Sequence, residues 1–304
     1  MRLAAVSDLH YPESGADLPA LAAAVRDARA DALVLVGDAV SQYHPPLLTE
    51  VLTAFTDACP VRVFVPGNHE LWSREGSTAR LYEQSLPDLC EQHGWHYLDA
   101  GPVYVGEVAI VGNVGWYDYS LTDRVTFADV RVALGAEALK AMRGKSCPTM
   151  PLGALTDEHL AEKSLVVVPP PQWAEAGFKP ALLRWNDARW VRLGVSDAAF
   201  TLDCARRLRE HLRQAENRAE RIVVAVHTAP FLEALPTPGN PVEALTRAYQ
   251  GARVLGEAIA ESRKVVLAVH GHRHRPGVHD VNGLPVINVT GRPDRGGSVV
   301  IRDV

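Results

Sequence analysis

Seven polar residues of metal-ligating type lie just past the ends of short apolar runs in this chain. They comprise two carboxylates, four imidazoles and one amide, and a further histidine, His69, adjoins the amide. In an open parallel sheet the ligand crevice lies at the carboxyl ends of the strands, so these side chains are expected to converge there. Such a set suits a pair of divalent cations and predicts metal-assisted hydrolysis. The seven residues are Asp8, His10, Asp38, Asn68, His227, His272 and His274.

The apolar runs that precede these residues have the composition of buried parallel strands. Asp8 and His10 are two positions apart, as are His272 and His274, and on an extended segment each pair faces the same side. Either pair alone is weak support for a metal site, whereas their joint occurrence after several strands is strong support. The expected strands cover residues 3–6, 33–36, 61–65, 222–226 and 265–269.

The order of elements predicts an α/β fold. Helical patterns near 18–30, 46–58 and 77–93 alternate with the first strands, which is typical of βαβ units and a parallel sheet. Closely spaced short strands follow in two clusters, near 95–111 and 277–301. We therefore expect two packed sheets flanked by helices.

The ordered motifs resemble those of the calcineurin-like metallophosphoesterase superfamily. The resemblance spans nearly the whole chain and implies a four-layer αββα sandwich with two mixed sheets and the metal site at the carboxyl ends of the strands. The matching motifs are Asp8-Leu9-His10, Gly37-Asp38, Gly67-Asn68-His69-Glu70, His227 and Gly271-His272-Arg273-His274.

The resemblance also implies a role for each residue. Asp8, His10 and His274 would hold one metal, and Asn68, His227 and His272 the other. Asp38 would bridge them, since a carboxylate offers two oxygens and a negative charge. The implied nucleophile is a metal-bridging hydroxide. His69, adjacent to a ligand, is the expected general acid because histidine titrates near neutral pH.

A glutamate and three glycines of these motifs are expected to support the metal site. Glu70 is expected either to orient His69 or to cap the following helix, and capping is the preferred reading. Gly37, Gly67 and Gly271 fit positions where the backbone turns sharply or approaches the metals closely.

Residues 115–195 lie outside the family pattern and are expected to form a helical or irregular cap within a single domain of residues 1–304. Asp118 follows a predicted strand and is a weaker candidate for a supporting contact to the metal site. The tryptophans of this segment are expected either to form the cap's own core or to stack on a planar substrate group. They are Trp116, Trp173, Trp185 and Trp190.

Composition is that of an ordinary globular enzyme. The chain has 304 residues, 47% apolar content and a formal charge of −5, so it can bury a large core and shows no basic footprint for nucleic acid. Its four cysteines form no CxxC pair and are expected to be reduced.

No export signal or apolar span of about 20 residues is visible, so a cytoplasmic location is expected. A cluster at Arg206, Arg207, Arg209 and Arg213 is expected to be a solvated helix face.

Three functions remain open from the sequence. The leading hypothesis is hydrolysis of small phosphodiesters or nucleotide-like phosphoesters; a phosphomonoesterase or a nuclease on the same site is the alternative, and a noncatalytic metal-binding scaffold ranks last. The chain lacks the Asp-Arg-Gly continuation of Ser/Thr protein phosphatases after Asp38, and it has His69 where lipid A pyrophosphatases carry Arg. Two divalent cations are expected, Mn²⁺ first and Fe, Zn²⁺ or Co²⁺ as alternatives. The oligomeric state stays open.

Overall fold

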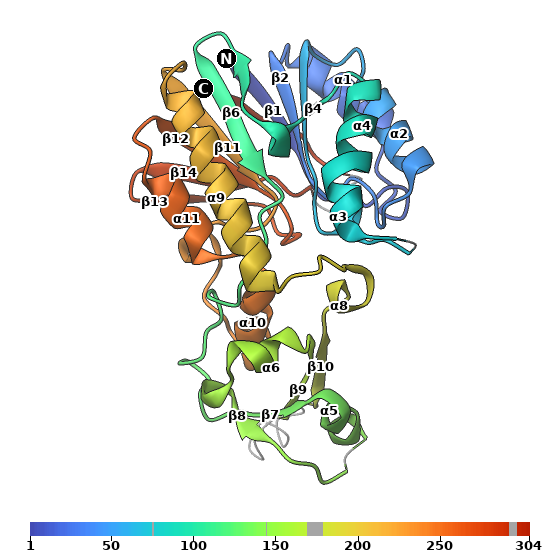
Figure 1. Ribbon diagram of the computed structural model, residues 1–304, viewed down its shortest axis with the longest axis vertical. Helices are drawn as coiled ribbons and strands as arrows, with labels where there is room; N and C mark the ends of the chain where they lie inside the picture. Colours follow the sequence, from blue (N-terminus) through green and yellow to red (C-terminus); the bar gives the residue numbers. More distant parts are fainter. Residues whose placement is uncertain (75, 144, 169–178, 292–296) are drawn as a thin grey trace.

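The computed structural model describes residues 1–304 except 75, 144, 169–178 and 292–296. Two sheets pack face to face with helices on both outer sides, and a smaller lobe with a third sheet extends from one end (Figure 1). The predicted αββα sandwich is confirmed. Both chain termini lie at the end of the sandwich opposite the small lobe (Figure 1).

The first sheet is parallel except at one edge. Its strand order is β15-β1-β2-β3-β4, and only β15 runs antiparallel to its neighbour. β2 has the sequence ALVLV and is buried along its whole length, as expected for a strand covered on both faces. The strands are β1 (Arg2–Val6), β2 (Ala32–Val36), β3 (Val61–Val65), β4 (His96–Tyr97) and β15 (Val300–Asp303).

The second sheet has a parallel centre and two antiparallel edges, in the order β13-β14-β12-β11-β6-β5. Valine, leucine, isoleucine and alanine side chains from both sheets form the core between them. The strands are β5 (Val103–Val105), β6 (Val108–Asn113), β11 (Arg221–Val226), β12 (Val265–His270), β13 (Gly277–Val281) and β14 (Leu284–Asn288).

Each predicted strand cluster divides between the two sheets. β4 joins the first sheet while β5 and β6 join the second, and at the end of the chain β13 and β14 join the second sheet while β15 returns to the first. The sequence pattern indicates strands but not their partners, because partners are chosen by long-range packing.

Helices cover the outer faces of both sheets (Figure 1). α1 begins at an Asp17 side chain that accepts from the Ala20 backbone N–H, which satisfies a free donor of the first turn. The expected helix at 77–93 is broken by a π turn at Leu81–Ser85. The helices on the first sheet are α1 (Leu18–Asp27), α2 (Pro45–Ala54), α3 (Thr78–Arg80) and α4 (Leu86–Gln92), and those on the second are α9 (Asp197–Glu216) and α11 (Arg253–Ala260).

The inserted segment differs from the expected helical or irregular cap. It contains a four-stranded antiparallel sheet, in the order β10-β9-β7-β8, together with short helices. The run Ser164–Val168 is rich in valine, which favours a strand, and its three central residues are buried. The predicted Trp173 lies outside the described residues. The elements are β7 (Arg131–Leu134), α5 (Gly135–Met142), β8 (Met150–Pro151), α6 (Asp157–Ala161), β9 (Ser164–Val168), β10 (Ala181–Arg184) and α8 (Asp187–Trp190).

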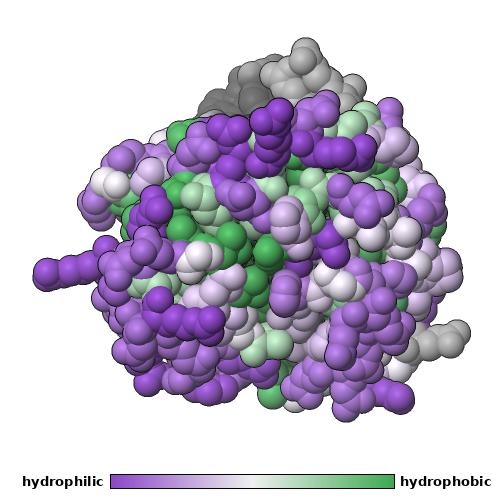
Figure 2. All heavy atoms as spheres, turned by 90° about the horizontal axis from the view of Figure 1, so that it is seen from above, coloured by the Kyte–Doolittle hydropathy of each residue, from purple (hydrophilic) through white to green (hydrophobic). Residues whose placement is uncertain are grey.

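The surface and the cysteines agree with the expectations from composition. The end of the molecule that carries the termini is mostly hydrophilic, with a small apolar area near its centre (Figure 2). All four cysteines are free thiols. The four arginines of α9 face solvent or pair with carboxylates such as Asp203 and Glu261. No described helix combines the length and apolarity that crossing a bilayer requires.

Candidate metal centre

The eight predicted site residues come together where strands of both sheets end. Asp8, Asp38 and Asn68 follow β1, β2 and β3 of the first sheet, and His227 and His272 follow β11 and β12 of the second. Five of them have a backbone φ between +41° and +69°, a region that non-glycine residues seldom adopt. Such conformations persist only where the surrounding structure holds them, and they cluster at functional sites. These five residues are Asp8, His10, Asp38, His272 and His274.

One group of ligands consists of Asp8, His10, Asp38 and His274, whose donor atoms all lie within 4.8 Å of one another. The Nε2 atoms of His10 and His274 are 2.9 Å apart. His274 Nε2 lies 3.2 Å from Asp8 Oδ1, and His10 Nε2 lies 3.7 Å from Asp38 Oδ2. These are the donors that the sequence assigns to one metal together with the bridging carboxylate.

A second group consists of Asp38, His227 and His272, again within 4.8 Å. His227 Nε2 lies 3.4 Å from Asp38 Oδ2. The side-chain oxygen of Asn68 lies 3.0 Å from His272 Nδ1 and 3.2 Å from His227 Nε2. Asp38 therefore belongs to both groups, which is the position that a bridging carboxylate requires.

The donor set fits two divalent cations. Each group places carboxylate or amide oxygens and imidazole nitrogens around a common point, a mixture that suits first-row metals. Most of these side chains are buried, since Asp38 is 1% exposed and His227 0%. The His10, His69 and His274 side chains are 15%, 20% and 45% exposed, so solvent reaches the centre from their side.

Hydrogen bonds to backbone carbonyls fix the orientation of three imidazoles. His227 Nδ1 lies 2.8 Å from Val36 O, His272 Nε2 lies 2.9 Å from Tyr249 O, and His69 Nδ1 lies 2.7 Å from Ser41 O. A carbonyl accepts only, so each of these nitrogens carries a proton, and the opposite nitrogen is directed into the site. His272 Nδ1 is thereby available as a metal ligand. Although burial opposes it, Asp38 and Asp8 raise the pKa of His227 to about 10, so a cation at His227 Nε2 would replace a proton there.

The carboxylates are held in their charged form. Burial alone would raise the pKa of Asp8, but hydrogen bonding to His274 and the charge of His227 lower that pKa to about 2. Burial also opposes ionisation of Asp38, yet His227 and His69 hold the pKa of Asp38 well below its usual range. Burial and the neighbouring His227 lower the pKa of His272 to about 4, which keeps this imidazole neutral. Charged carboxylates and a neutral imidazole are the forms that bind cations.

Glu70 has a role that differs from both expectations. Its buried carboxylate accepts hydrogen bonds from the backbone N–H groups of Asp38 (2.8 Å), Val40 (3.1 Å) and Gly67 (2.7 Å). It neither contacts His69 through its side chain nor caps a helix among the described residues. Glu70 instead ties the loop that carries Asp38 to the loop that carries Asn68.

All three predicted glycines are required by close approach, since a Cβ on Gly271 would lie 2.4 Å from Asp8 Oδ2. A Cβ on Gly67 would lie 2.2 Å from Asp38 Oδ1, and a Cβ on Gly37 would lie 2.4 Å from His227 Nδ1. Gly37 also has a φ of +79°. Any side chain at these positions would displace a metal ligand.

Asp187 is a supporting residue that sequence reasoning missed. It is 0% exposed and accepts hydrogen bonds from Asn68 Nδ2 (2.9 Å), Tyr117 Oη (2.9 Å), Trp185 Nε1 (2.8 Å) and Trp72 Nε1. Asp118, the candidate from sequence, instead accepts from Ser120 in a local turn. The only signal for Asp187 was its place in the polar cluster 185–187.

The predicted tryptophans have different environments. Trp116 is fully buried, with ring contacts to Tyr117 and Phe200, so it belongs to the core. Trp185 stacks on Tyr249 at a centroid distance of 5.0 Å and lies 5.8 Å from the His272 ring. Trp190 lies near the guanidinium of Arg189, at 4.5 Å. Trp185 is therefore the described cap tryptophan closest to the candidate ligands.

His69 is placed to act on a group bound at the centre. Its ring stacks on Trp72 with centroids 3.7 Å apart and planes inclined by 25°. Its Nε2 lies 3.9 Å from Asp38 Oδ2. Since Nδ1 is held by the Ser41 carbonyl, Nε2 is the atom that can exchange a proton with a ligand in the site.

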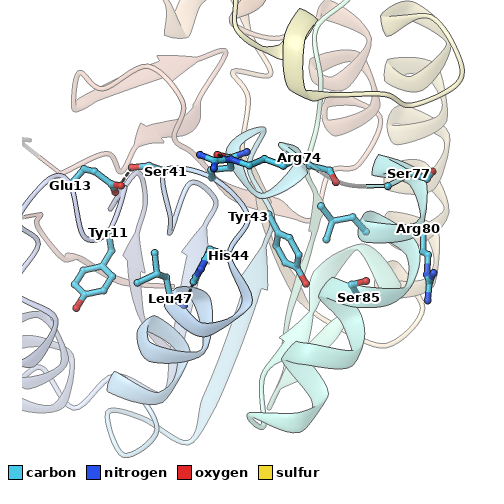
Figure 3. A pocket seen from close by; sticks show the side chains of 14 residues that line it. Tyr11, Glu13, Ser41, Tyr43, His44, Leu47, Arg74, Ser77, Arg80 and Ser85 are labelled. Atoms are coloured by element: carbon cyan, nitrogen blue, oxygen red, sulfur yellow. Dashed lines mark hydrogen bonds between the residues drawn. The ribbon is translucent and has the colours of Figure 1, made fainter.

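A cavity of about 600 Å³ adjoins this side of the centre, which is within the range of small-molecule sites. Tyr11, one residue past His10, and Ser41, whose carbonyl binds His69, form part of its wall. Tyr11 and Glu13 lie on one side of the cavity and Arg80 on the other (Figure 3). The cavity therefore combines hydroxyl, aromatic and charged groups beside residues that adjoin or contact His10 and His69.

Comparisons with known proteins identify the motif set. Residues 1–276 match the family of calcineurin-like phosphoesterases. The phosphopantetheinyl hydrolase of Mycobacterium tuberculosis has a similar structure, with a TM-score of 0.66 and 19% identity over 97% of this chain and 90% of that chain. A dimetal phosphatase from Danio rerio aligns with a TM-score of 0.49 and 15% identity over 95% of this chain and 86% of that one. No curated protein sequence matches.

Proposed function

Because this chain belongs to the calcineurin-like phosphoesterase family, and is therefore a phosphoric ester hydrolase, we propose that it hydrolyses small phosphodiesters in a metal-dependent reaction. The observation that carries the proposal is the pair of ligand groups that share Asp38. Two divalent cations bound there would lower the pKa of a water and neutralise charge on the phosphoryl oxygens. The mixed oxygen and imidazole donors suit Mn²⁺, Fe, Zn²⁺ and Co²⁺ alike, and Mn²⁺ is the first metal to test.

The chain's own residues supply the remaining functions. Asp8, His10 and His274 hold one side of the centre, and Asn68, His227 and His272 hold the other. Asp38 joins the two sides because its carboxylate lies near histidines of both. The carbonyls of Val36 and Tyr249 keep the ligand rings in place.

His69 is proposed as the general acid. Its Nε2 is directed toward the centre, while Nδ1 is fixed by Ser41 and the ring is supported by Trp72. In the proposed reaction, His69 Nε2–H donates its proton to the ester oxygen that leaves. An alkoxide leaves poorly from phosphorus, so this proton matters most for alkyl esters.

The cavity next to His69 supports an ester with a sizeable leaving group. At about 600 Å³ it has room for an organic group on the side where His69 would protonate the leaving oxygen. A monoester and a diester both expel an organic group on this side, so the cavity fits either ester. The preference for a diester is the hypothesis that the experiment below tests.

A phosphopantetheinyl ester is one specific substrate worth testing. The phosphopantetheinyl hydrolase resembles 97% of this chain in structure. At 19% identity that likeness concerns the fold, so the substrate is a candidate for experiment. A nuclease is the less favoured alternative, because the formal charge is −5.

The test compares bis-p-nitrophenyl phosphate with p-nitrophenyl phosphate as substrates of chelator-stripped protein titrated with Mn²⁺. Metal-restored turnover of the diester in preference to the monoester is the expected result. Preference for the monoester would replace the proposal with a phosphatase. No turnover of either ester by protein that holds two metals per chain would favour the scaffold reading over the diesterase.

A further inference from the structure

A second, smaller cavity of about 170 Å³ lies beside the last metal motif and is rich in arginine. Its walls include Arg247, Arg273 and Arg275, together with Gln250 and Glu243. The volume is several times the ~30 Å³ that one water occupies, so a small polyatomic ion fits. The cavity does not share lining residues with the larger cavity next to His69.

The three guanidiniums are not neutralised by ion pairs. Over the residues that the structure describes, no carboxylate oxygen lies within 4.0 Å of their nitrogens. Glu243, the acidic residue in the wall, accepts from the Gly239 backbone N–H at 2.8 Å. Asp123, outside the wall, also acts electrostatically on Arg247, so three positive charges face two negative charges and the excess is one positive charge.

The positive charges also crowd one another. Arg247, Arg273 and Arg275 all line the wall of this one small cavity. Arg273 and Arg247 are half-buried, and Arg275 is exposed. Like charges that lie close together in a partly buried cavity are unfavourable in free energy unless an anion neutralises them.

A buried amide in the same wall lacks a partner. Gln250 is only 7% exposed, and its side-chain oxygen makes no hydrogen bond to any described residue. A carboxamide carries two N–H donors and one acceptor, and turning it exchanges their positions. Gln250 can therefore offer N–H groups to an anion that the arginines attract.

The cavity is connected to the candidate metal centre through the chain. Arg273 stands between the ligands His272 and His274. Gln250 follows Tyr249, whose carbonyl holds the ring of His272. An anion in this cavity would contact residues that are adjacent in the chain to candidate ligands, and it would lie in a different cavity from a leaving group beside His69.

We propose that the cavity formed by Arg247, Gln250, Arg273 and Arg275 binds a phosphate-type anion. The source is either a second phosphate on the substrate, on the part of the diester that stays with the metals, or a free phosphate ion. Guanidinium groups suit either source, because their N–H groups match the oxygens of a phosphate. The assignment to substrate rests on the proposed diesterase activity, whereas binding of the anion does not.

The first experiment measures binding of inorganic phosphate to the full-length, metal-free chain by calorimetry, so that metals do not bind the ion. The variants are Arg275→Gln, which removes an exposed charge that makes no side-chain hydrogen bond or ion pair with a described residue, and Arg247→Gln. Arg213→Gln on α9 is the matched control, because its side chain is 68% exposed and pairs only with Glu210. Thermal unfolding of every protein shows that it is folded.

We expect wild type to bind one phosphate and each cavity variant to bind it at least about tenfold more weakly, the scale of one charged hydrogen bond. The control variant should bind like wild type. The proposal would be overturned if folded wild type bound no phosphate at about 10 mM, a concentration that detects even very weak affinity. It would also be overturned if all variants bound phosphate equally well.

A second experiment separates the two sources in the metal-loaded enzyme. It compares kcat/KM for the p-nitrophenyl ester of thymidine 5′-phosphate with and without a 3′-phosphate. If the substrate supplies the anion, the 3′-phosphate raises kcat/KM and Arg275→Gln removes that advantage. If kcat/KM is the same for both esters while wild type binds inorganic phosphate in the first experiment, the site is assigned to the free ion. Failure of wild type to hydrolyse either ester would refute the proposed function while leaving the anion site in place.

Discussion

The side-chain N–H of Asn68 donates a hydrogen bond of 2.9 Å to Asp187, a residue 119 positions later in the chain. Asp187 begins the short helix α8 in the inserted segment. The bond directs the Asn68 amide so that its oxygen faces His227 and His272. The inserted segment therefore takes part in positioning a candidate metal ligand.

Asp187→Asn should weaken binding of the metal that Asn68 helps to hold. In wild type the indole and hydroxyl donors face two carboxylate oxygens. In the variant one of these oxygens is replaced by an NH₂ group, so the donors around Asn68 lose an acceptor. Loss of a hydrogen bond that orients a ligand typically lowers metal affinity about 10–100-fold. Metal content after dialysis against graded Mn²⁺, measured by mass spectrometry, gives the result.

Tyr117→Phe is the matched control for this substitution. It removes one donor to Asp187, at 2.9 Å, without touching Asn68. We expect this variant to keep both metals. If Asp187→Asn also retained two metals per chain with wild-type affinity, the positioning role would be refuted.

His69→Ala should abolish most of the activity without loss of metal. The general acid contribution is about 10²–10⁴-fold in rate, and His69 is outside both ligand groups. The measurements are kcat on an alkyl phosphodiester and metal stoichiometry. His96→Ala, at an exposed histidine on β4, is the control. Loss of metal together with activity would show that His69 acts as a ligand.

Gly67→Ala should disrupt the centre by displacing Asp38. The added Cβ would lie 2.2 Å from Asp38 Oδ1 and 2.5 Å from its backbone N, so the two loops must move apart. Overpacking of this kind costs about 1–3 kcal/mol of unfolding free energy, and here it also moves the bridging ligand. Denaturant unfolding and metal content measure the two effects.

Gly239→Ala provides the comparison for Gly67→Ala. Its added Cβ would be 3.6 Å from Glu243 Oε2, an ordinary contact. The unfolding free energy and the metal content should therefore stay close to those of wild type. If Gly67→Ala behaved in the same way, the close approach of the two loops would not be needed for the site.

Asp99 should make the protein less stable as the pH rises. Burial raises the pKa of Asp99 from 3.8 to about 7, although the Tyr82 hydroxyl and the Val114 backbone N–H donate to it. The folded state therefore holds this proton more tightly than the unfolded state does. The resulting stability is complete below about pH 4 and is lost as the pH rises to about 7.

Asp99→Asn tests this directly, because an amide does not titrate. The pKa difference corresponds to at most about 4 kcal/mol of unfolding free energy. The variant should therefore become more stable relative to wild type as the pH rises from 4 to 7. Denaturant unfolding at several pH values measures the difference, with exposed Asp57→Asn as the control. A constant difference across this range would mean that Asp99 keeps its ordinary pKa.

The sequence by itself predicted which residues form the candidate metal centre and the kind of fold that brings them together. Asp8, Asp38 and Asn68 each follow a short apolar run, and the carboxyl ends of parallel strands meet at one edge. Residue type and local spacing were sufficient there, because strand periodicity and strand ends are properties of short segments. The same reasoning placed the helices α1 and α2 to within a few residues.

The tertiary structure decided which distant groups support that centre. Asp187 reaches Asn68, the Tyr249 carbonyl holds His272, and the arginines at 247 and 275 share one cavity. The inserted sheet and the exchange of strands between the two main sheets were likewise not visible in local patterns. These contacts join segments far apart in the chain, and they depend on how packed layers dock, which no local periodicity encodes.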